Sequence, residues 1–425
     1  MSNRCGDANT VRECMARRHD KENPMWRPFL HCGILACAIF ASLPAAANAQ
    51  SLKNDEVLSS IILQPVGVPA PVLGADGRMH LAYELLAVNA SPSLVTLDRI
   101  EALDQAGAVL ATFNQRTLDQ DIVQFAGKGT TLAPGAGAMV ALDIALPPYR
   151  PLPKTIAERV SATRARIGPG GKPVPLEPGS PVPAHYVFTG ASVALSPMRA
   201  LTVEPPLRGK NWVAGGGCCE TVTPHRATGL VVNGKLVVGQ RFAIDWYQLD
   251  AHDRDVTGDP SRLSSYPSFG ASVHSATDGV VVNLYDRALE QVPGHPKGVK
   301  AENIGGNMVV VKARPGIFAF YGHMQPGSLT IKLGDHVRVG QVIGLLGNTG
   351  NSTAPHLHFQ LMDGPSPLNA SGLPFVFTHF SSRGTLVQDR EPMSDPSRPV
   401  TIDKNRLAGI HIQQMPLNDE VVDFD

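Results

Sequence analysis

Turn-forming residues divide this chain into short apolar segments. Among its 425 residues are 41 glycines and 36 prolines, and the valine-, isoleucine- and leucine-rich segments between them seldom reach the length of a helix. His80–Val88 runs into the turn Asn89–Pro92, for example, and Leu94–Ile100 largely alternates apolar and polar residues with a period of two. Segments of this kind predict a mostly β protein.

The length and composition of the chain allow two domains. Hydrophobic residues make up 43% of the chain and charged residues 17%, so a substantial core can be buried. The proline-containing stretch Glu204–Gly209 is a boundary signal. We expect an immunoglobulin-like β-sandwich over residues 50–205, a second domain over 206–385 and an irregular extension over 386–425.

The first 49 residues have the pattern of an export signal. Basic residues between positions 17 and 27 precede an apolar run over 33–43, and Ala47–Ala49 fits the small-x-small pattern of a cleavage site. An uncleaved membrane anchor is the alternative, but a membrane-spanning helix needs about 20 apolar residues and this run is shorter. We therefore expect cleavage after Ala49 and a periplasmic or secreted protein without a membrane span.

The charge balance argues against a nucleic acid partner. Lysine plus arginine and aspartate plus glutamate both number 37, which gives a formal net charge of +0. The sequence also has no basic run interleaved with aromatic residues, which binding to a phosphate backbone would require. We therefore expect no binding to nucleic acid.

Cysteine is scarce in the expected mature protein. Of the 6 cysteines, only Cys218 and Cys219 follow the expected cleavage site, which is too few for a disulfide-stabilised scaffold. In an oxidising compartment these neighbours could form a disulfide with each other, remain reduced, or bridge to another chain. A role as zinc ligands is less favoured, because adjacent side chains rarely converge on one ion.

Two histidines separated by one residue, His356 and His358, follow a turn rich in glycine, asparagine, serine and threonine. Side chains alternate across a strand, so both imidazoles are expected on one face. With 14 histidines in 425 residues, chance alone gives such a pair roughly half a time per chain, so the pair by itself is weak. Tyr321–His323 and Phe242–Asp245 strengthen it, because each puts a ligand-type side chain at the end of an apolar segment. Together these segments predict a metal site.

Six motifs between Arg208 and Phe380 resemble those of the lysostaphin-type (M23) family of zinc metallopeptidases, which cut peptide cross-bridges in bacterial peptidoglycan. The motifs are Arg241–Trp246, Ala276–Val281, Gly306–Val311, Phe320–Met324, Val337–Gly344 and Gly347–Phe359. The resemblance implies an antiparallel-sheet peptidase domain after the sandwich, one Zn²⁺ per chain, and peptidoglycan peptides as the partner.

By that resemblance, Asp245 and His358 are zinc ligands, and His323 and His356 are catalytic histidines. Two histidines and one aspartate leave a fourth position on zinc open for water. The sequence has no His-Glu-x-x-His motif, so another residue must accept the proton of that water. His323 and His356 suit by pKa, and one of them would take the proton while the other hydrogen-bonds the oxyanion.

The chain departs from the family at the third ligand. The family places a ligand histidine four residues before the aspartate, where this chain has Arg241. His225 is the best candidate in its place, with His252 and His274 as alternatives. The residues between His225 and the aspartate include 231–237, which is expected to be an inserted hairpin with an Asn-Gly turn. Zinc fixes geometry in space, so a ligand from an earlier segment can still take part.

Five further histidines and aspartates are expected to have no catalytic role. His80 and His185 lie in the expected sandwich without ligand-type neighbours at useful spacing, so surface positions or satisfied hydrogen bonds are predicted for them. Asp278, Asp335 and His336 lie in turn segments and are expected to form turns or face solvent. The long loop 285–305 is a second departure from the family and is expected to border the cleft.

Two other function classes remain open. A non-catalytic M23-like module could bind the cell wall or regulate a cell-wall amidase, as degenerate family members do after losing ligands or catalytic histidines. A structural zinc site in an adhesion-type β protein would instead have closed coordination. Because this chain keeps His323, His356, His358 and Asp245, the sequence favours an exported zinc metalloendopeptidase.

Overall fold

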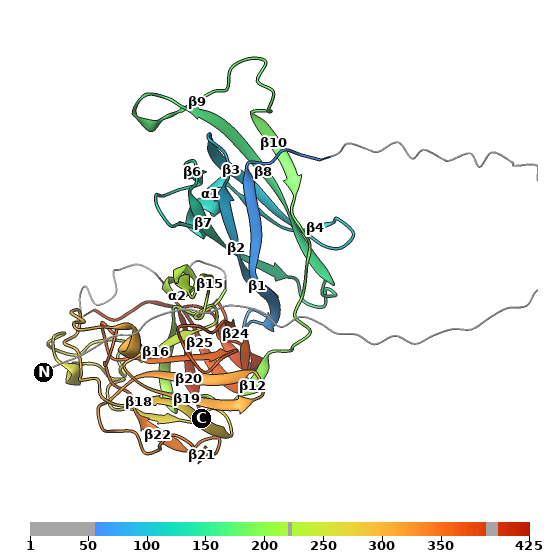
Figure 1. The fold of residues 1–425 in the computed structure, drawn as a ribbon. Coiled ribbons are helices and arrows are strands. Elements are labelled where there is room, and N and C mark those ends of the chain that lie inside the picture. Colours follow the sequence, from blue (N-terminus) through green and yellow to red (C-terminus); the bar gives the residue numbers. More distant parts are fainter. Residues whose placement is uncertain (1–55, 220–222, 388–397) are drawn as a thin grey trace, which may run out of the picture. The chain divides into compact units, whose positions relative to one another are not determined.

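The computed structural model describes residues 56–219, 223–387 and 398–425. The expected export signal and its cleavage site lie outside these residues. The described part is mostly β, as predicted, with strands β1 to β28 and the short helices α1 (Gln115–Asp121) and α2 (Pro224–Ala227) (Figure 1). None of its helices is both long enough and apolar enough to cross a membrane.

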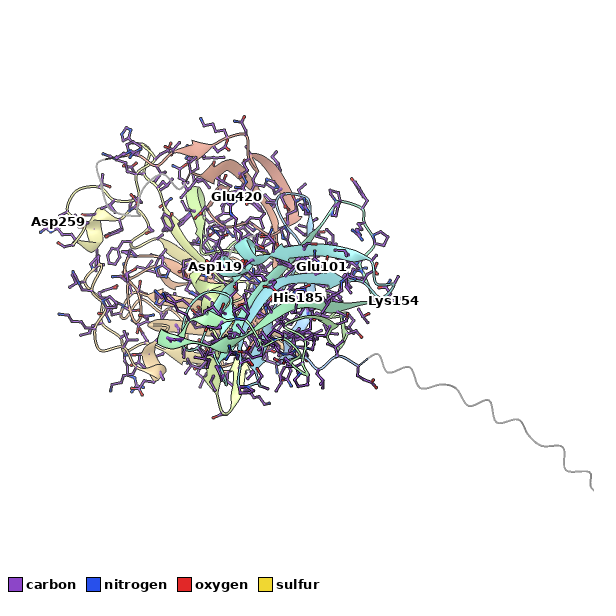
Figure 2. All side chains as sticks on the ribbon, turned by 90° about the horizontal axis from the view of Figure 1, so that it is seen from above. Glu101, Asp119, Lys154, His185, Asp259 and Glu420 are labelled. Atoms are coloured by element: carbon purple, nitrogen blue, oxygen red, sulfur yellow. A yellow bond between two sulfur atoms is a disulfide. The ribbon has the colours of Figure 1, made fainter. Side chains whose placement is uncertain are left out.

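Two antiparallel sheets form the predicted sandwich in the N-terminal part. One has the order β1 (Ile61–Leu73), β2 (Met79–Asn89), β7 (Gly137–Leu146), β5 (Ile122–Gln124). The other is built on the order β10 (His185–Thr189), β8 (Thr155–Ile167), β3 (Leu94–Leu103), β4 (Val109–Asn114). Leu85, Ile100 and Val160 are among the side chains from both sheets that share one core. His185 is exposed at the start of β10, as predicted (Figure 2). The immunoglobulin-like character of this sandwich remains a prediction.

Strand β2 is buried on both of its faces. Leu81, Tyr83 and Leu85 point into the sandwich core and are at most 1% exposed, while the alternate residues His80 and Glu84 are 0% exposed on the other face. Ala82, also on that second face, belongs to the core of the C-terminal sheet. The polar groups of β2 are therefore removed from water and need partners inside the protein.

One large sheet dominates the C-terminal part. Its strand order is β12 (Leu201–Val203), β25 (Phe375–Leu386), β28 (Glu420–Phe424), β13 (Gly209–Gly215), β16 (Ile244–Gln248), β23 (Leu357–Met362), β20 (Ile317–Met324), β19 (Asn307–Arg314), β18 (Gly279–Tyr285), β21 (His336–Val337). Two smaller pairs are β14 (Leu230–Val232) with β15 (Lys235–Val237) and β17 (Ser272–His274) with β22 (Val342–Leu345). Within the large sheet β12 and β25 are parallel, and the central strands β16, β23 and β20 are antiparallel neighbours (Figure 1).

The prediction of an irregular extension is wrong for much of the described C-terminus. β26 (Ile402–Asp403), β27 (Gly409–Gln414) and β28 all pair with β25, and β28 also pairs with β13. Val421 and Val422 of β28 are 0% exposed. The acidic composition of this end gave no sign of a strand in the sequence. β28 nevertheless pairs with both β25 and β13, whose edges would otherwise carry unpaired backbone groups.

Candidate metal centre

Strand register brings Asp245 and His358 side by side. Asp245 lies opposite His358 in the β16–β23 pair, and Gly322 of β20 lies opposite His358 on its other side. Their chain neighbours Trp246 and Phe359 are 0% exposed in the hydrophobic core. Because side chains alternate along a strand, Asp245 and His358 point to the opposite face of the sheet.

Helix α2 places His225 next to Asp245. The hairpin β14–β15 separates this helix from β16, and its turn has φ of 50° at Asn233 and 78° at Gly234, so the predicted Asn-Gly turn is confirmed. Beyond the hairpin the chain enters β16, and His225 Nε2 lies 3.1 Å from Asp245 Oδ2. The inserted residues therefore do not keep His225 away from the aspartate.

The other polar residues considered from the sequence lie outside this group. His274 directs Nδ1 to a backbone carbonyl oxygen at 2.9 Å, and His252 is exposed in a turn after β16. Asp278 and Asp335 accept backbone N–H groups at 2.8 and 3.0 Å, as expected of turn residues, and His336 is exposed.

The side chains of His225, Asp245 and His358 meet in a group of possible metal ligands. One candidate ligand atom from each lies within 4.8 Å of the others. Asp245 stands between the two imidazoles, with Oδ2 at 3.1 Å from His225 Nε2 and Oδ1 at 2.8 Å from His358 Nδ1. Two imidazole nitrogens and a carboxylate oxygen match the donors that zinc takes in catalytic sites.

Hydrogen bonds outside the group fix which nitrogen of each imidazole faces inward. His225 Nδ1 donates to the carbonyl oxygens of Gly216 at 2.9 Å and Ala243 at 3.1 Å, so its Nε2 is the nitrogen that faces Asp245. His358 Nε2 lies 2.8 Å from Gln360 Oε1, which leaves Nδ1 facing Asp245. The amide nitrogen of Gln360 in turn donates to a backbone carbonyl at 3.1 Å, which orients its oxygen toward His358. Bonds of this kind typically orient metal-binding histidines, so the residues present fit a metal ion.

Gln360 is a residue that sequence reasoning missed. It follows His358 by two positions on β23, so both side chains lie on the same face of the strand. Gln360 is 1% exposed. A glutamine two residues after a strand histidine is therefore the signal that could have identified it.

The two expected catalytic histidines lie against the group. His323 Nδ1 donates to Thr349 O at 2.7 Å, and His356 Nδ1 donates to Ala354 O at 2.7 Å. The ring centroids of His323 and His356 are 4.6 Å apart, and His356 Nε2 lies 3.4 Å from Asp245 Oδ1. His323 also has a φ of 64°, a backbone conformation that is uncommon outside glycine and is concentrated at functional sites.

Charges in the centre shift the pKa of several groups. Burial lowers the pKa of His323 to about 3, and the neighbouring His356 and His358 add to this effect. Burial also opposes a positive charge on His356, but the Asp245 carboxylate outweighs it and raises the pKa of His356. For Asp245, His225 and His356 outweigh the effect of burial and hold the pKa of the carboxyl well below its usual range. Asp245 is therefore ionised at neutral pH, as a metal ligand must be.

A cleft of about 290 Å³ opens beside these residues. Its lining includes His225, Asp245 and His356, together with Tyr247 and Tyr266. This volume lies near the lower end of the range for small-ligand clefts, about 300–1,000 Å³.

The long loop expected to border the cleft pairs with the segment that carries His356. Gln291 N donates to Asn348 O at 2.9 Å, and Gly294 N donates to Thr353 O at 2.6 Å. Thr353 itself lines the cleft. The loop therefore supports one wall of the cleft through the residues that precede His356.

Comparison with known proteins places part of this region in a family. Residues 265–370 match the model of Peptidase family M23. These residues include His323, His356 and His358 but leave out His225 and Asp245.

Several curated proteins are similar to short parts of the chain. Glycyl-glycine endopeptidase ALE-1 of Staphylococcus capitis is 37% identical over 81 residues, which are 19% of this chain and 22% of that protein. Lysostaphin of Staphylococcus simulans is 45% identical over 58 residues, 14% of this chain and 12% of that protein. Peptidoglycan DD-endopeptidase ShyA of Vibrio cholerae is 36% identical over 101 residues, 24% of this chain and 20% of that protein. The chain thus spans at most 22% of the length of each of these relatives.

A solved structure of the catalytic domain of lysostaphin from Staphylococcus simulans is 24% identical to this chain, with a TM-score of 0.21, and covers 38% of this chain and 88% of that domain. A TM-score this low does not establish a common fold.

Proposed function

Because the chain carries a domain of peptidase family M23, we propose that it is an exported zinc metalloendopeptidase that hydrolyses peptide bonds in bacterial peptidoglycan stem or cross-bridge peptides. The observation that carries this proposal is the convergence of His225, Asp245 and His358 next to His323 and His356. The names of the relatives support the substrate, since they include glycyl-glycine and peptidoglycan endopeptidases. The expected signal over residues 1–49 supports a periplasmic or secreted location.

His225, Asp245 and His358 would hold the zinc ion, one per chain. A zinc ion bound there would polarise the scissile carbonyl and activate water at neutral pH. Three protein ligands leave a position for these reactants, whereas a fourth ligand from His356 would close it. His356 is therefore assigned to catalysis rather than to the metal.

His323 and His356 would move the protons. Each donates its Nδ1–H to a backbone carbonyl, at 2.7 Å in both cases, so each has Nε2 available to accept a proton or, once protonated, to donate one. Their rings lie 4.6 Å apart, close enough for both to act on one scissile peptide. One would take the proton of the attacking water while the other hydrogen-bonds the developing oxyanion.

The test is metal analysis beside digestion of purified peptidoglycan, with mass spectrometry of the released peptides. The protein starting at residue 50 should hold one zinc per chain, lose hydrolysis on chelation and recover it with zinc. His358→Ala should lose zinc and hydrolysis together, whereas His252→Ala, the loss of an exposed histidine outside the centre, should change neither. Undiminished hydrolysis after complete chelation, or no new peptide ends with the zinc-loaded protein, would refute the proposed function.

A further inference from the structure

We propose that Glu84, in the N-terminal sandwich, is a positioning residue for the metal centre. Its carboxylate contacts two arginines, Arg226 and Arg241, which belong to the two chain segments that hold His225. The sandwich would thereby take part in placing a metal ligand of the C-terminal domain. This inference rests on the proposed metal site at His225, Asp245 and His358.

Glu84 is buried. Its side chain lies on the face of β2 opposite the sandwich core. It is 0% exposed, and its two partners are also buried, Arg226 at 1% and Arg241 at 5% exposure. Charges at this depth are stable only when they are paired, because each is costly to remove from water. One carboxylate is thus shared by guanidinium groups from two segments that the β14–β15 hairpin connects.

The first contact runs through Arg241, just before β16. Its Nε lies 2.7 Å and its Nη2 2.5 Å from Glu84 Oε2, and Nη2 also donates to Val66 O at 3.0 Å. Ala243 follows two residues later, and its carbonyl oxygen accepts the Nδ1–H of His225 at 3.1 Å. Glu84 therefore anchors the segment that orients His225 from one side. Arg241, which stands where the family has a ligand histidine, makes this contact.

The second contact runs through Arg226, the chain neighbour of His225. Its Nη2 lies 3.7 Å from Glu84 Oε1 and donates to Leu142 O at 2.9 Å, while its Nη1 donates to Cys219 O at 2.8 Å. Cys219 follows closely after Gly216, whose carbonyl is the other acceptor for His225 Nδ1, at 2.9 Å. Arg226 thus ties His225 and one of its two acceptor segments to the sandwich.

Both acceptors of His225 Nδ1 are therefore held by segments that converge on Glu84. Neutralising Glu84 would leave two buried guanidinium groups without their shared counter-ion, and the segments carrying Gly216 and Ala243 would be expected to shift. Outer residues that orient a metal-binding histidine commonly change metal affinity by about 10–100-fold when they are lost. We expect a change of this size for Glu84→Gln.

The test compares Glu84→Gln with Glu158→Gln in the protein starting at residue 50. Glu158 is a matched control, because it is also buried, at 1% exposure, and its hydrogen-bond partner is Tyr83, at 2.9 Å, inside the sandwich. Affinity for zinc is measured by competition with a chelator, and the absorption spectrum of the cobalt-loaded protein reports the ligand geometry. Glu84→Gln should bind zinc about 10–100-fold more weakly and alter the cobalt spectrum. Glu158→Gln should match the wild type in both, whatever it does to thermal stability.

Arg226→Lys provides a second route if Glu84→Gln does not fold. Lysine keeps a positive charge near Glu84 but replaces the forked guanidinium with a single ammonium group, so we expect weaker zinc binding and an altered cobalt spectrum here too. The role of Glu84 is overturned if a folded Glu84→Gln has the zinc affinity and cobalt spectrum of the wild type. If only Arg226→Lys folds, the same result in that variant overturns it. Either result leaves the proposed peptidase function intact. Absence of zinc binding by the wild type would overturn both.

Discussion

The sandwich and the metal centre each bury histidine among carboxylates, but they use the two ring nitrogens differently. In the sandwich, His80 places Nδ1 at 2.7 Å from Asp143 and Nε2 at 3.1 Å from Asp76. Burial opposes a charge on this ring, yet the two carboxylates outweigh it and raise the pKa of His80 to about 10. Both nitrogens are therefore protonated and paired, and the cluster is a closed ionic unit.

In the metal centre each imidazole gives only one nitrogen to an outer acceptor. These acceptors are backbone carbonyls for His225, His323 and His356 and a side-chain amide oxygen for His358. An uncharged acceptor holds one N–H without demanding a second proton on the ring, so the other nitrogen can bind a metal or move a proton. A histidine held at both nitrogens by carboxylates is thus structural, whereas one held at a single nitrogen by an uncharged acceptor keeps the other nitrogen for chemistry.

Cys219, at the edge of the His80 cluster, is also unavailable as a metal ligand. It lies with His80 and Asp143 within 4.8 Å, a spacing that would suit metal ligands. Its sulfur, however, is bonded to that of Cys218, which is one of the alternatives open from the sequence. Zinc binds a thiolate and not a disulfide sulfur. The group of His80, Asp143 and Cys219 is therefore not expected to bind a metal ion.

The largest effect is expected from breaking the metal centre at its central carboxylate. Asp245→Ala removes the group that contacts both His225 and His358. Zinc and peptidoglycan hydrolysis should both fall below detection, as measured by elemental analysis and product release. Stoichiometric zinc of unchanged affinity in Asp245→Ala would remove Asp245 from the ligand set.

A large but different effect is expected from the two histidines that are not assigned as ligands. His323→Ala and His356→Ala should each keep zinc while turnover falls about 10²–10⁴-fold, the range for loss of a general acid–base group. Zinc content and hydrolysis rates measured on the same samples decide this. The assignment fails if His323→Ala hydrolyses at the wild-type rate, or if His356→Ala loses zinc while His358→Ala keeps it.

A smaller effect is expected at the outer acceptor of His358. Gln360→Ala leaves all three proposed ligands in place but removes the oxygen that holds His358 Nε2 at 2.8 Å. Zinc affinity should weaken about 10–100-fold, and excess zinc should restore hydrolysis. Titration of hydrolysis with zinc checks this, and a wild-type titration curve would contradict the role given to Gln360.

The smallest effect on hydrolysis is expected at His80, where the consequence lies in stability. Its folded pKa of about 10 lies above its ordinary value of 6.5, so protonated His80 stabilises the fold fully below pH 6.5 and loses that contribution as pH rises toward 10. Between these values the urea midpoint of the wild type should fall more steeply than that of His80→Gln. Zinc affinity should be the same in both proteins. Parallel stability curves would show that His80 does not carry the charge inferred for it.

Local patterns predicted a good part of this molecule from sequence. Short segments between turns predicted the mostly β class, the Asn233-Gly234 pair predicted the hairpin, and period-two alternation predicted one face for His356 and His358, which both face Asp245 Oδ1. Each of these features depends on neighbours in the chain or on a single strand pair.

Contacts between distant segments were not accessible in the same way. Asp143 lies 63 positions from His80, and Glu84 lies 157 positions from Arg241, so neither pairing leaves a local pattern. The prediction for His80 was right that its hydrogen bonds are satisfied, but ligand-type neighbours do surround it in space. The strands at the C-terminus were missed for a related reason, since their partners β13 and β25 lie far from β28 in sequence.

We expect that histidine nitrogens left available by uncharged acceptors form the metal site, while those held by two carboxylates do not. A crystal structure of the zinc-loaded protein, with anomalous data at the zinc absorption edge, tests it most directly. One zinc per chain is predicted, bound by His225 Nε2, Asp245 and His358 Nδ1, with no metal at His80. Zinc bound at His80 and Asp143, or a zinc at Asp245 that lacks His225, would contradict it.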